Sequence, residues 1–232
     1  MPPAARGSIT RWLARSVLGT VLYAAVLFIP AGTLGWLWGW VLLSILIGLM
    51  IAEPAITAAR HPDLLAERDL SWRAAGVKAW DRWITTLVGG LMLGQWVTAG
   101  LDFRFHWTAP LALPVHLAAL AVTLLGHAVF LWAMASNAFF SGTVRIQVER
   151  GHAVEDGGPY RFVRHPGYVG VILTQVSTPI LLGSLWALVP GLIAVAFFIL
   201  RTRLEDETLQ RELAGYADYT RRTHFRLLPG VW

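Results

Sequence analysis

The chain has no cysteine among its 232 residues. This absence excludes a disulfide framework, thiolate catalysis and any zinc or iron–sulfur site with cysteine ligands. The common catalytic signatures are also missing: there is no Walker loop, no G-x-S-x-G turn, no H-E-x-x-H pair and no strand–G-x-G-x-x-G–helix unit. The histidines His106, His116 and His127 are not spaced as a metal set. We therefore expect neither a soluble Rossmann-type cofactor domain nor a metal site.

Charge is scarce as well. Asp, Glu, Lys and Arg make up 14% of the chain and hydrophobic residues 56%, whereas an average soluble domain is about 25% charged. A membrane-spanning helix needs about 20 apolar residues. Stretches of that order without any charged residue lie at 16–52, 83–101, 105–144 and 165–200. The chain therefore reads as an integral membrane protein.

The predicted fold class is an all-α, polytopic membrane helix bundle with five or six transmembrane helices. The first and last uncharged stretches are long enough for two crossings each, and both have helix breakers near the middle, at Pro30, Gly32 and Gly35 and at Gly183 and Ser184. The six crossings are predicted near 14–30, 36–56, 83–101, 112–136, 168–182 and 185–200. The alternative is five, because the crossing at 168–182 is short.

Basic residues are distributed asymmetrically around these crossings. With six crossings, every Lys and Arg except Arg104 falls on one side of the membrane. Basic flanks are retained in the cytoplasm, so both termini and the polar motifs should face it. The net charge of +5 lies beside apolar spans and is interleaved with acids, which favours membrane lipids over nucleic acid as a partner. Eighteen arginines against one lysine are typical of a GC-rich bacterial genome and predict a bacterial cytoplasmic (inner) membrane.

We predict two regions along the chain. Residues 1–136 hold the N-terminal transmembrane helices, with an interfacial connector at 57–82. Residues 137–232 form a membrane-embedded region made of a motif loop, a helical hairpin and a C-terminal cytoplasmic tail that caps the site. In the first region, Gly35 with Gly39 and Gly90 with Gly94 are each four residues apart, a spacing that permits close contact between helices.

The most informative motif is Gly158-Pro159-Tyr160-Arg161 followed by Arg164-His165-Pro166-Gly167-Tyr168. Proline suits the first turn of a helix, so the fifth crossing should begin at Pro166. Arg164 and His165 would then flank a helix N-terminus, which favours an anion. The same Arg-His-Pro tripeptide at residues 60–62 is not followed by an apolar span. The tripeptide alone is therefore not specific, and the residues around the second copy make it so. A basic interface anchor remains the alternative interpretation.

A second polar cluster follows the last apolar stretch at Arg201, Glu205 and Asp206. Because a helical hairpin folds back on itself, we expect this cluster to meet the first motif and form one site with it. Ionisable groups near membrane depth are usually functional, and a carboxylate here is suited to hold ribose hydroxyls or an ammonium group. The alternative is a solvated helix start with an Arg201–Glu205 pair.

At these residues the chain resembles the isoprenylcysteine carboxyl methyltransferase family, and more broadly the membrane methyltransferases that include phospholipid N-methyltransferases. The resemblance covers roughly residues 137–232. Members of the family commonly have two glutamates where this chain has Glu205-Asp206, so the carboxylate pair is kept. The matching elements are the two motif segments at 158–161 and 164–168, the hairpin, Arg201, Glu205-Asp206, Leu209, and the tail from Gly215-Tyr216-Ala217-Asp218-Tyr219 to Leu228-Pro229.

The resemblance implies S-adenosylmethionine as cofactor, held by a cytoplasmic loop and a C-terminal helix, and a lipophilic small-molecule or lipid acceptor that enters from the bilayer. A carboxylate on an isoprenoid or prenylated thioether is the favoured acceptor. Arg164 or Arg201 would orient that carboxylate, whereas an amine or thiol acceptor would need Glu205 or His165 as a base. The resemblance also implies which residues contact the cofactor: Gly158, Tyr160, His165, Pro166, Tyr168, Glu205 and Asp206.

Other functions fit the residues as well. Within the same reaction class, the acceptor could be a phospholipid, another amine or a thiol. A membrane reductase of the sterol type, which uses NADPH, has a similar multi-span plan. A non-catalytic, lipid-binding membrane protein is the third interpretation.

Overall fold

The computed structural model describes residues 3–64 and 76–232, with side chains from residue 16 onward. The described chain is helical and contains no β-strand, which confirms the predicted all-α class. Two short 3-10 helices, η1 (Val148–Arg150) and η2 (Gly158–Arg161), lie between the long helices. The α-helices are α1 (Pro3–Ala31), α2 (Leu37–Arg60), α4 (Ala79–Phe105), α5 (Leu113–Ser136), α6 (Pro166–Leu181), α7 (Leu188–Glu212) and α8 (Tyr216–Arg222).

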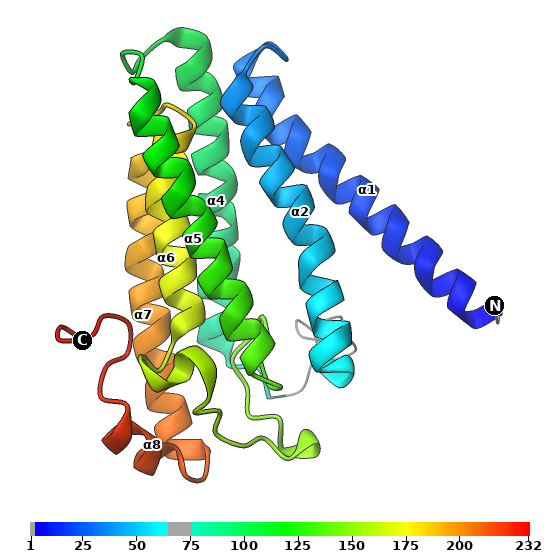
Figure 1. Cartoon of the computed structure of the whole chain (residues 1–232), viewed down its shortest axis with the longest axis vertical. Coiled ribbons are helices and arrows are strands. Elements are labelled where there is room, and N and C mark those ends of the chain that lie inside the picture. Colours follow the sequence, from blue (N-terminus) through cyan, green and yellow to red (C-terminus); the bar gives the residue numbers. More distant parts are fainter. Residues whose placement is uncertain (1–2, 65–75) are drawn as a thin grey trace.

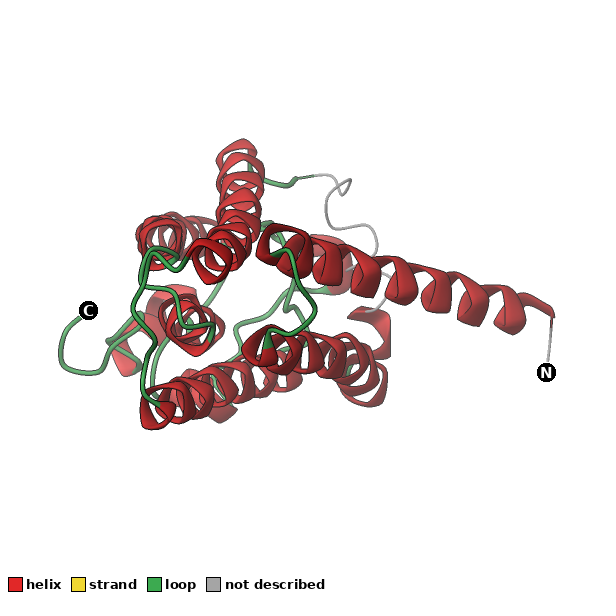
Figure 2. Ribbon diagram, turned by 90° about the horizontal axis from the view of Figure 1, so that it is seen from above, coloured by secondary structure: helices red, strands yellow, loops and turns green. Residues whose placement is uncertain are grey.

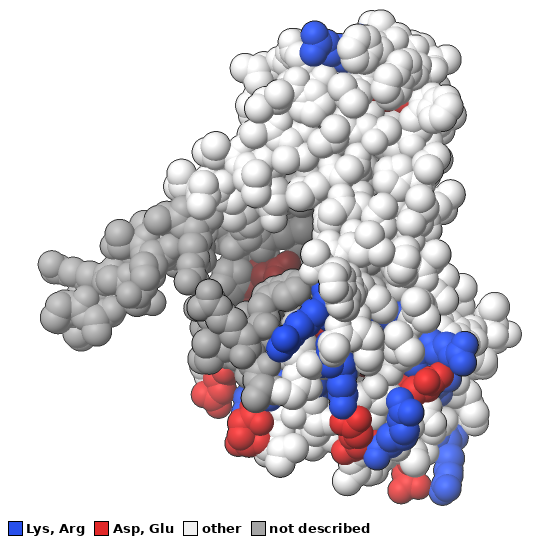
Figure 3. All heavy atoms as spheres, turned by 180° about the vertical axis from the view of Figure 1, so that it is seen from behind, with Lys and Arg blue, Asp and Glu red and all other residues white. Residues whose placement is uncertain are grey.

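The long helices form an elongated bundle. Figure 1 shows α2, α4, α5, α6 and α7 running along its long axis, with α8 and the C-terminal tail at one end. Helix α1 leaves the bundle toward the N-terminus, which is also visible from above in Figure 2. Figure 3 shows acidic and basic side chains gathered at the end that carries α8. This segregation of charge is the arrangement expected of an integral membrane protein.

Three of the described helices, α2, α4 and α5, are long and apolar enough to cross a membrane. Helix α6 begins at Pro166, as predicted, and has only 16 residues. At a rise of about 1.5 Å per residue it is about 24 Å long, less than the roughly 30 Å hydrocarbon core of a bilayer. Helix α7 is apolar only up to Leu200, because Arg201 begins its polar part. The number of crossings therefore stays a prediction.

The predicted breakers end helices where expected. Helix α1 ends at Ala31, and Gly32 follows with φ of +68°. Helix α6 ends at Leu181, and Gly183 follows with φ of +80°. A positive φ costs glycine little, because it has no Cβ to clash with the following carbonyl. Both sharp reversals are therefore local consequences of the sequence.

A buried carboxylate secures the bundle end opposite α8. Asp102 of α4 accepts hydrogen bonds from the Thr108 backbone N–H (2.7 Å) and the Thr108 hydroxyl (2.6 Å). It also accepts one from the Ser184 hydroxyl at 2.5 Å. These bonds join the α4–α5 connection to the α6–α7 turn. They hold the hairpin in the orientation that returns α7 to the charged end.

Glycines let α5, α6 and α7 pack with their backbones in contact. A Cβ on Gly126 of α5 would lie 2.7 Å from the carbonyl oxygen of Gly170 on α6. A Cβ on Gly191 of α7 would lie 2.7 Å from the Gln175 carbonyl oxygen of α6. Of the glycines whose spacing permits close contact, Gly39 of α2 has it, because a Cβ there would lie 3.2 Å from the Phe28 ring of α1, whereas a Cβ on Gly90 or Gly94 would meet no described atom within 4 Å. Their face of α4 points away from the described helices.

The predicted regional boundaries stay predictions. Helix α5 ends at Ser136, next to the expected boundary between residues 136 and 137. Of the connector at 57–82, residues 65–75 lie outside the described chain. The described part of the connector packs against the helix bundle: Leu64 is fully buried, and the His61 Nε2 atom lies 3.1 Å from the Ala135 carbonyl oxygen.

The α5–α6 contact predicts the effect of adding one methyl group. A Cβ on Gly170 would lie 2.8 Å from the Phe130 backbone nitrogen, so Gly170→Ala should force the helices apart and destabilise the protein by about 1–3 kcal/mol. Thermal unfolding of the detergent-solubilised protein measures this. Gly90→Ala is the matched control, and it should be neutral or slightly stabilising because alanine favours a helix. Equal unfolding temperatures for the two variants would contradict the assigned contact.

Candidate active site

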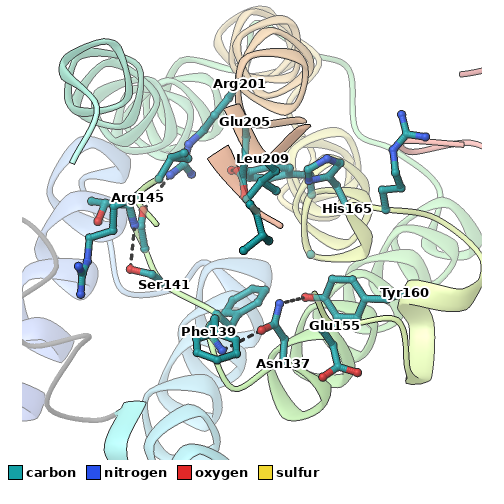
Figure 4. A pocket seen from close by; sticks show the side chains of 18 of the residues that line it. Asn137, Phe139, Ser141, Arg145, Glu155, Tyr160, His165, Arg201, Glu205 and Leu209 are labelled. Atoms are coloured by element: carbon teal, nitrogen blue, oxygen red, sulfur yellow. Dashed lines mark hydrogen bonds between the residues drawn. The ribbon is translucent and has the colours of Figure 1, made fainter. Parts of the chain in front are cut away.

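A cavity of about 310 Å³ lies at the charged end of the bundle. Its walls come from α4, α5, α6, α7 and α8 and from the long segment between α5 and α6. Figure 4 shows side chains from these elements converging on it. One side is apolar, with one residue from each of four helices: Met92, Phe130, Val171 and Phe198. The cavity therefore joins an apolar bundle interior to a polar rim.

The structure brings six of the nine predicted site residues to this cavity. Gly158, Pro166 and Asp206 do not line it. Gly158 has a φ of +51° and packs against Ser136, and Pro166 opens α6. The six predicted site residues that line the cavity are Tyr160, Arg164, His165, Tyr168, Arg201 and Glu205. The expected meeting of the two polar motifs is thus observed in the described structure.

Tyr168 and Glu205 link the two motifs directly. The Tyr168 hydroxyl of α6 donates a hydrogen bond to the Glu205 carboxylate of α7. The Arg201 guanidinium lies over the Tyr168 ring, 5.3 Å from its centroid. Glu205 thus presents a carboxylate to the cavity with one oxygen bonded to a phenol, close to a buried cation.

Arg201 pairs with an acid that the sequence did not single out. Its Nε donates to Asp81 Oδ1 at 2.7 Å, and its Nη2 donates to the Gly142 carbonyl at 2.8 Å. Asp81 is fully buried in the first turn of α4 and also accepts a bond from the Val144 backbone N–H at 2.8 Å. The alternative Arg201–Glu205 pair is not what forms. Asp81 was missed because it stands between Lys78 and Arg82, where it resembles part of an interfacial anchor.

The side-chain nitrogens of Arg164 all donate hydrogen bonds to other residues of the chain. Its Nε and Nη2 donate to Asp206 at 2.8 and 3.1 Å. Its Nη1 donates to the backbone carbonyls of Thr223 (3.0 Å) and His224 (2.8 Å). By contrast, Nη1 of Arg201 has no hydrogen-bond partner among the described residues. Of the two arginines proposed to orient a substrate, Arg201 is therefore the one with donors to spare.

Asp206 lies behind the cavity wall and is fully buried. It faces Arg164, His165, Gln210, Tyr216 and Arg226. Burial alone would raise the pKa of Asp206, but hydrogen bonds from His165, Arg226 and Arg164 outweigh it and hold that pKa far below its ordinary range. The carboxylate therefore stays ionised, and it supports other side chains of the wall.

The segment between α5 and α6 supplies a wall that the motifs did not reveal. The Phe139 and His152 rings stack with centroids 4.5 Å apart, and Gln147 donates to the Phe139 carbonyl at 2.9 Å. Burial, with smaller contributions from nearby arginines, lowers the pKa of His152 to about 4, so its imidazole is neutral near pH 7. Glu155 also lines the cavity, and Asn137 donates to the Tyr160 hydroxyl at 3.2 Å. No residue spacing in this segment marks these side chains as neighbours.

Comparisons of sequence match part of this chain. Residues 119–211 match the family model of the Isoprenylcysteine carboxyl methyltransferase (ICMT) family, which confirms the resemblance read from the motifs. Proteins called "Probable protein-S-isoprenylcysteine O-methyltransferase" from Oryza sativa subsp. indica and subsp. japonica are each 29% identical over 87 residues. That alignment covers 37% of this chain and 46% of each rice protein. The chain thus matches somewhat less than half the length of these curated relatives.

One solved structure has a similar fold over the whole chain. It is the eukaryotic intramembrane Ras methyltransferase ICMT (isoprenylcysteine carboxyl methyltransferase), determined without a monobody. The TM-score is 0.55 with 16% sequence identity, and the alignment covers 100% of this chain and 88% of that structure. At this identity the likeness supports the membrane helix bundle rather than any particular site residue.

The Arg201–Asp81 pair predicts a large cost for removing one charge. Asp81→Asn should leave the Arg201 guanidinium buried without a counter-charge, which costs about 3 kcal/mol of stability. Thermal or denaturant unfolding in detergent measures this. Glu207→Gln is the control, because Glu207 pairs with Arg203 on the exposed face of the same helix. If both variants unfold alike, the pair does not hold α4 against α7.

Proposed function

We propose that this chain is an integral-membrane methyltransferase that transfers a methyl group from S-adenosylmethionine to a lipophilic acceptor, with a carboxylate on an isoprenoid or prenylated thioether favoured. The observation that carries the proposal is the meeting of His165 and Tyr168 with Arg201 and Glu205 in one cavity. These pairs come from motifs separated by an apolar hairpin, and both lie within the matched residues 119–211.

The residues of the cavity suit such a cofactor chemically. Glu205 and Glu155 offer carboxylates for an ammonium group or ribose hydroxyls, and the Phe139 and Tyr160 rings offer surfaces for a purine. Gly167 lets the Phe140 ring pack directly against the start of α6, because a Cβ there would lie 2.9 Å from that ring. When bound, the cofactor supplies an electrophilic methyl group on a sulfonium. We propose His165, Tyr168 and Glu205 as its principal contacts, with Tyr160 and Gly158 shaping the loop beside it.

For a carboxylate acceptor, the protein mainly has to align the reactants and exclude water. Direct methyl transfer is an in-line displacement, so orientation and a dry site account for much of its acceleration. The Nη1 group of Arg201 is the orienting donor that we propose for the carboxylate. An ionised carboxylate needs no base, so Glu205 can stay bonded to Tyr168. An amine or thiol acceptor would need Glu205 or His165 to remove a proton.

The position of the cavity fits an acceptor that comes from the bilayer. Its apolar side is formed by α4, α5, α6 and α7, and its polar side lies among the basic residues of the charged end. Basic residues are retained in the cytoplasm, so we propose that this end faces the cytoplasm of a bacterial inner membrane. An apolar tail would then lie along Met92 and Phe198 while its polar head reaches Arg201.

The cofactor assignment predicts a binding pattern. Detergent-purified protein should bind S-adenosylmethionine and S-adenosylhomocysteine, but not NADPH, in calorimetric titration. Glu205→Gln should weaken binding of both adenosyl ligands by about tenfold, because a hydrogen bond to a charged group is lost. Glu207→Gln, on the exposed face of α7, is the matched control. Binding of NADPH would instead support a reductase, and binding of neither ligand a non-catalytic module.

The role of Arg201 predicts a selective loss of activity. With an S-prenyl thioether acid as acceptor, Arg201→Lys should lower kcat/KM by about 100-fold, because the ammonium group keeps the charge opposite Asp81 but has no donor at the position of Arg201 Nη1. Methyl transfer from labelled cofactor measures this. Arg203→Lys changes an exposed arginine two residues away and should have no effect. An unchanged kcat/KM in Arg201→Lys would exclude this arginine as the carboxylate anchor.

A further inference from the structure

We propose that Asp206 is a positioning residue that latches the C-terminal tail, residues 223–232, onto the cavity wall and so fixes His165 and Tyr216. The consequence for ligand affinity rests on the proposed function, whereas the consequence for the tail does not. The sequence grouped Asp206 with the cofactor contacts beside Glu205. In the structure the two neighbours point in different directions from α7: Glu205 lines the cavity, and Asp206 lies behind its wall.

The hydrogen bonds of Asp206 come from four separate segments. Oδ1 faces Arg164 Nε (2.8 Å), the Tyr216 hydroxyl (3.0 Å) and His165 Nε2 (3.3 Å). Oδ2 faces Arg226 Nε (2.7 Å), Gln210 Nε2 (2.8 Å) and Arg164 Nη2 (3.1 Å). The loop before α6, α7 itself, α8 and the tail therefore meet on one side chain. Three of these partners, Arg164, His165 and Tyr216, line the cavity.

Only an ionised carboxylate suits this position. Asp206 has a fully buried side chain, and the two guanidiniums it faces are 7% (Arg164) and 24% (Arg226) exposed. Buried guanidiniums without a counter-charge are strongly destabilising. A neutral amide would offer one acceptor oxygen and would point its own N–H groups at donors. The charge of Asp206 is therefore needed to keep Arg164, Arg226 and the tail that they bind in place.

The tail is bound to the start of α6 through the same arginine. Arg164 Nη1 holds the carbonyls of Thr223 and His224, and the Arg164 backbone N–H donates to the Phe225 carbonyl at 2.9 Å. The His165 backbone N–H donates to the Arg226 carbonyl at 3.0 Å. The tail thus runs beside the residue that presents an imidazole to the cavity. Loosening the tail should loosen His165.

The C-terminal residue of the tail, Trp232, folds back against Arg226. The Arg226 guanidinium lies over the Trp232 ring, 4.9 Å from its centroid, and Leu227 is buried. The Trp232 carbonyl oxygen accepts hydrogen bonds from the backbone N–H groups of residues 226–228. Arg226 is therefore the side chain of the tail that bonds Asp206 directly, and at 24% exposure it can be replaced without leaving a cavity in the core.

The test compares Arg226→Gln with Arg221→Gln by hydrogen exchange of residues 223–228 in the ligand-free protein. Arg226→Gln should speed exchange of these amides about tenfold, because a bond to a charged group is lost. Arg221→Gln removes an exposed ion pair with Asp218 on α8 and should change nothing. Arg226→Lys should restore part of the protection. Unchanged exchange in Arg226→Gln, or faster exchange spread equally over α6 and α7, would overturn the latch.

A second arm measures ligand affinity on the same variants. Arg226→Gln should raise the Kd for S-adenosylhomocysteine about tenfold, while kcat at saturating substrates stays nearly constant, because Arg226 touches no reacting group. An unchanged Kd, or a fall in kcat without a change in Kd, would overturn the positioning role. If the wild-type protein binds no S-adenosylhomocysteine, the proposed function fails, and the exchange experiment still decides whether Asp206 latches the tail.

Discussion

The close pairing of α6 with α7 is the constraint on which the rest of the site depends. The two helices carry the polar motifs at their charged ends, and only an antiparallel hairpin brings those ends together. The pairing requires backbone contact, because Gly191 of α7 approaches the Gln175 carbonyl of α6, and Gly170 brings α6 equally close to α5. At the far end, Asp102 holds the turn through Ser184. Tight packing in the apolar part thereby sets the position of Tyr168 and Glu205.

The two buried arginines of the site differ in their hydrogen-bond partners. Arg201, which lines the cavity, is held at Nε and Nη2 by Asp81 and Gly142, so Nη1 is the nitrogen that these bonds leave over. Arg164 spends its donors on Asp206 and on the tail. Fixing a cation with a buried carboxylate is costly in desolvation, and its benefit is a defined orientation. A defined orientation is what a methyl transfer between two bound molecules requires.

Sequence reasoning identified the residues of the α6–α7 hairpin because their signals are local. A proline opens a helix, a glycine allows a reversal, and polar groups at the edge of an apolar stretch must meet other polar groups. It overlooked Asp81 because its partner Arg201 lies 120 residues away along the chain. It overlooked Gln147, His152 and Glu155 because their segment carries no residue spacing that marks them as neighbours. The spacing of Gly90 and Gly94 permits a helix contact, but it does not say whether another helix covers that face.

Composition and pattern by themselves determined that this chain is an all-α membrane bundle, that its charges gather at one end, and that two motifs share a site. These properties follow from hydrophobicity, helix length and backbone geometry, which act within short stretches. Only the tertiary structure decided that Glu205 faces the cavity while Asp206 lies behind its wall, and that Arg201 rather than Arg164 keeps a donor without a partner among the described residues. Neighbours on a helix point about 100° apart, so the packing of distant segments assigns each its role.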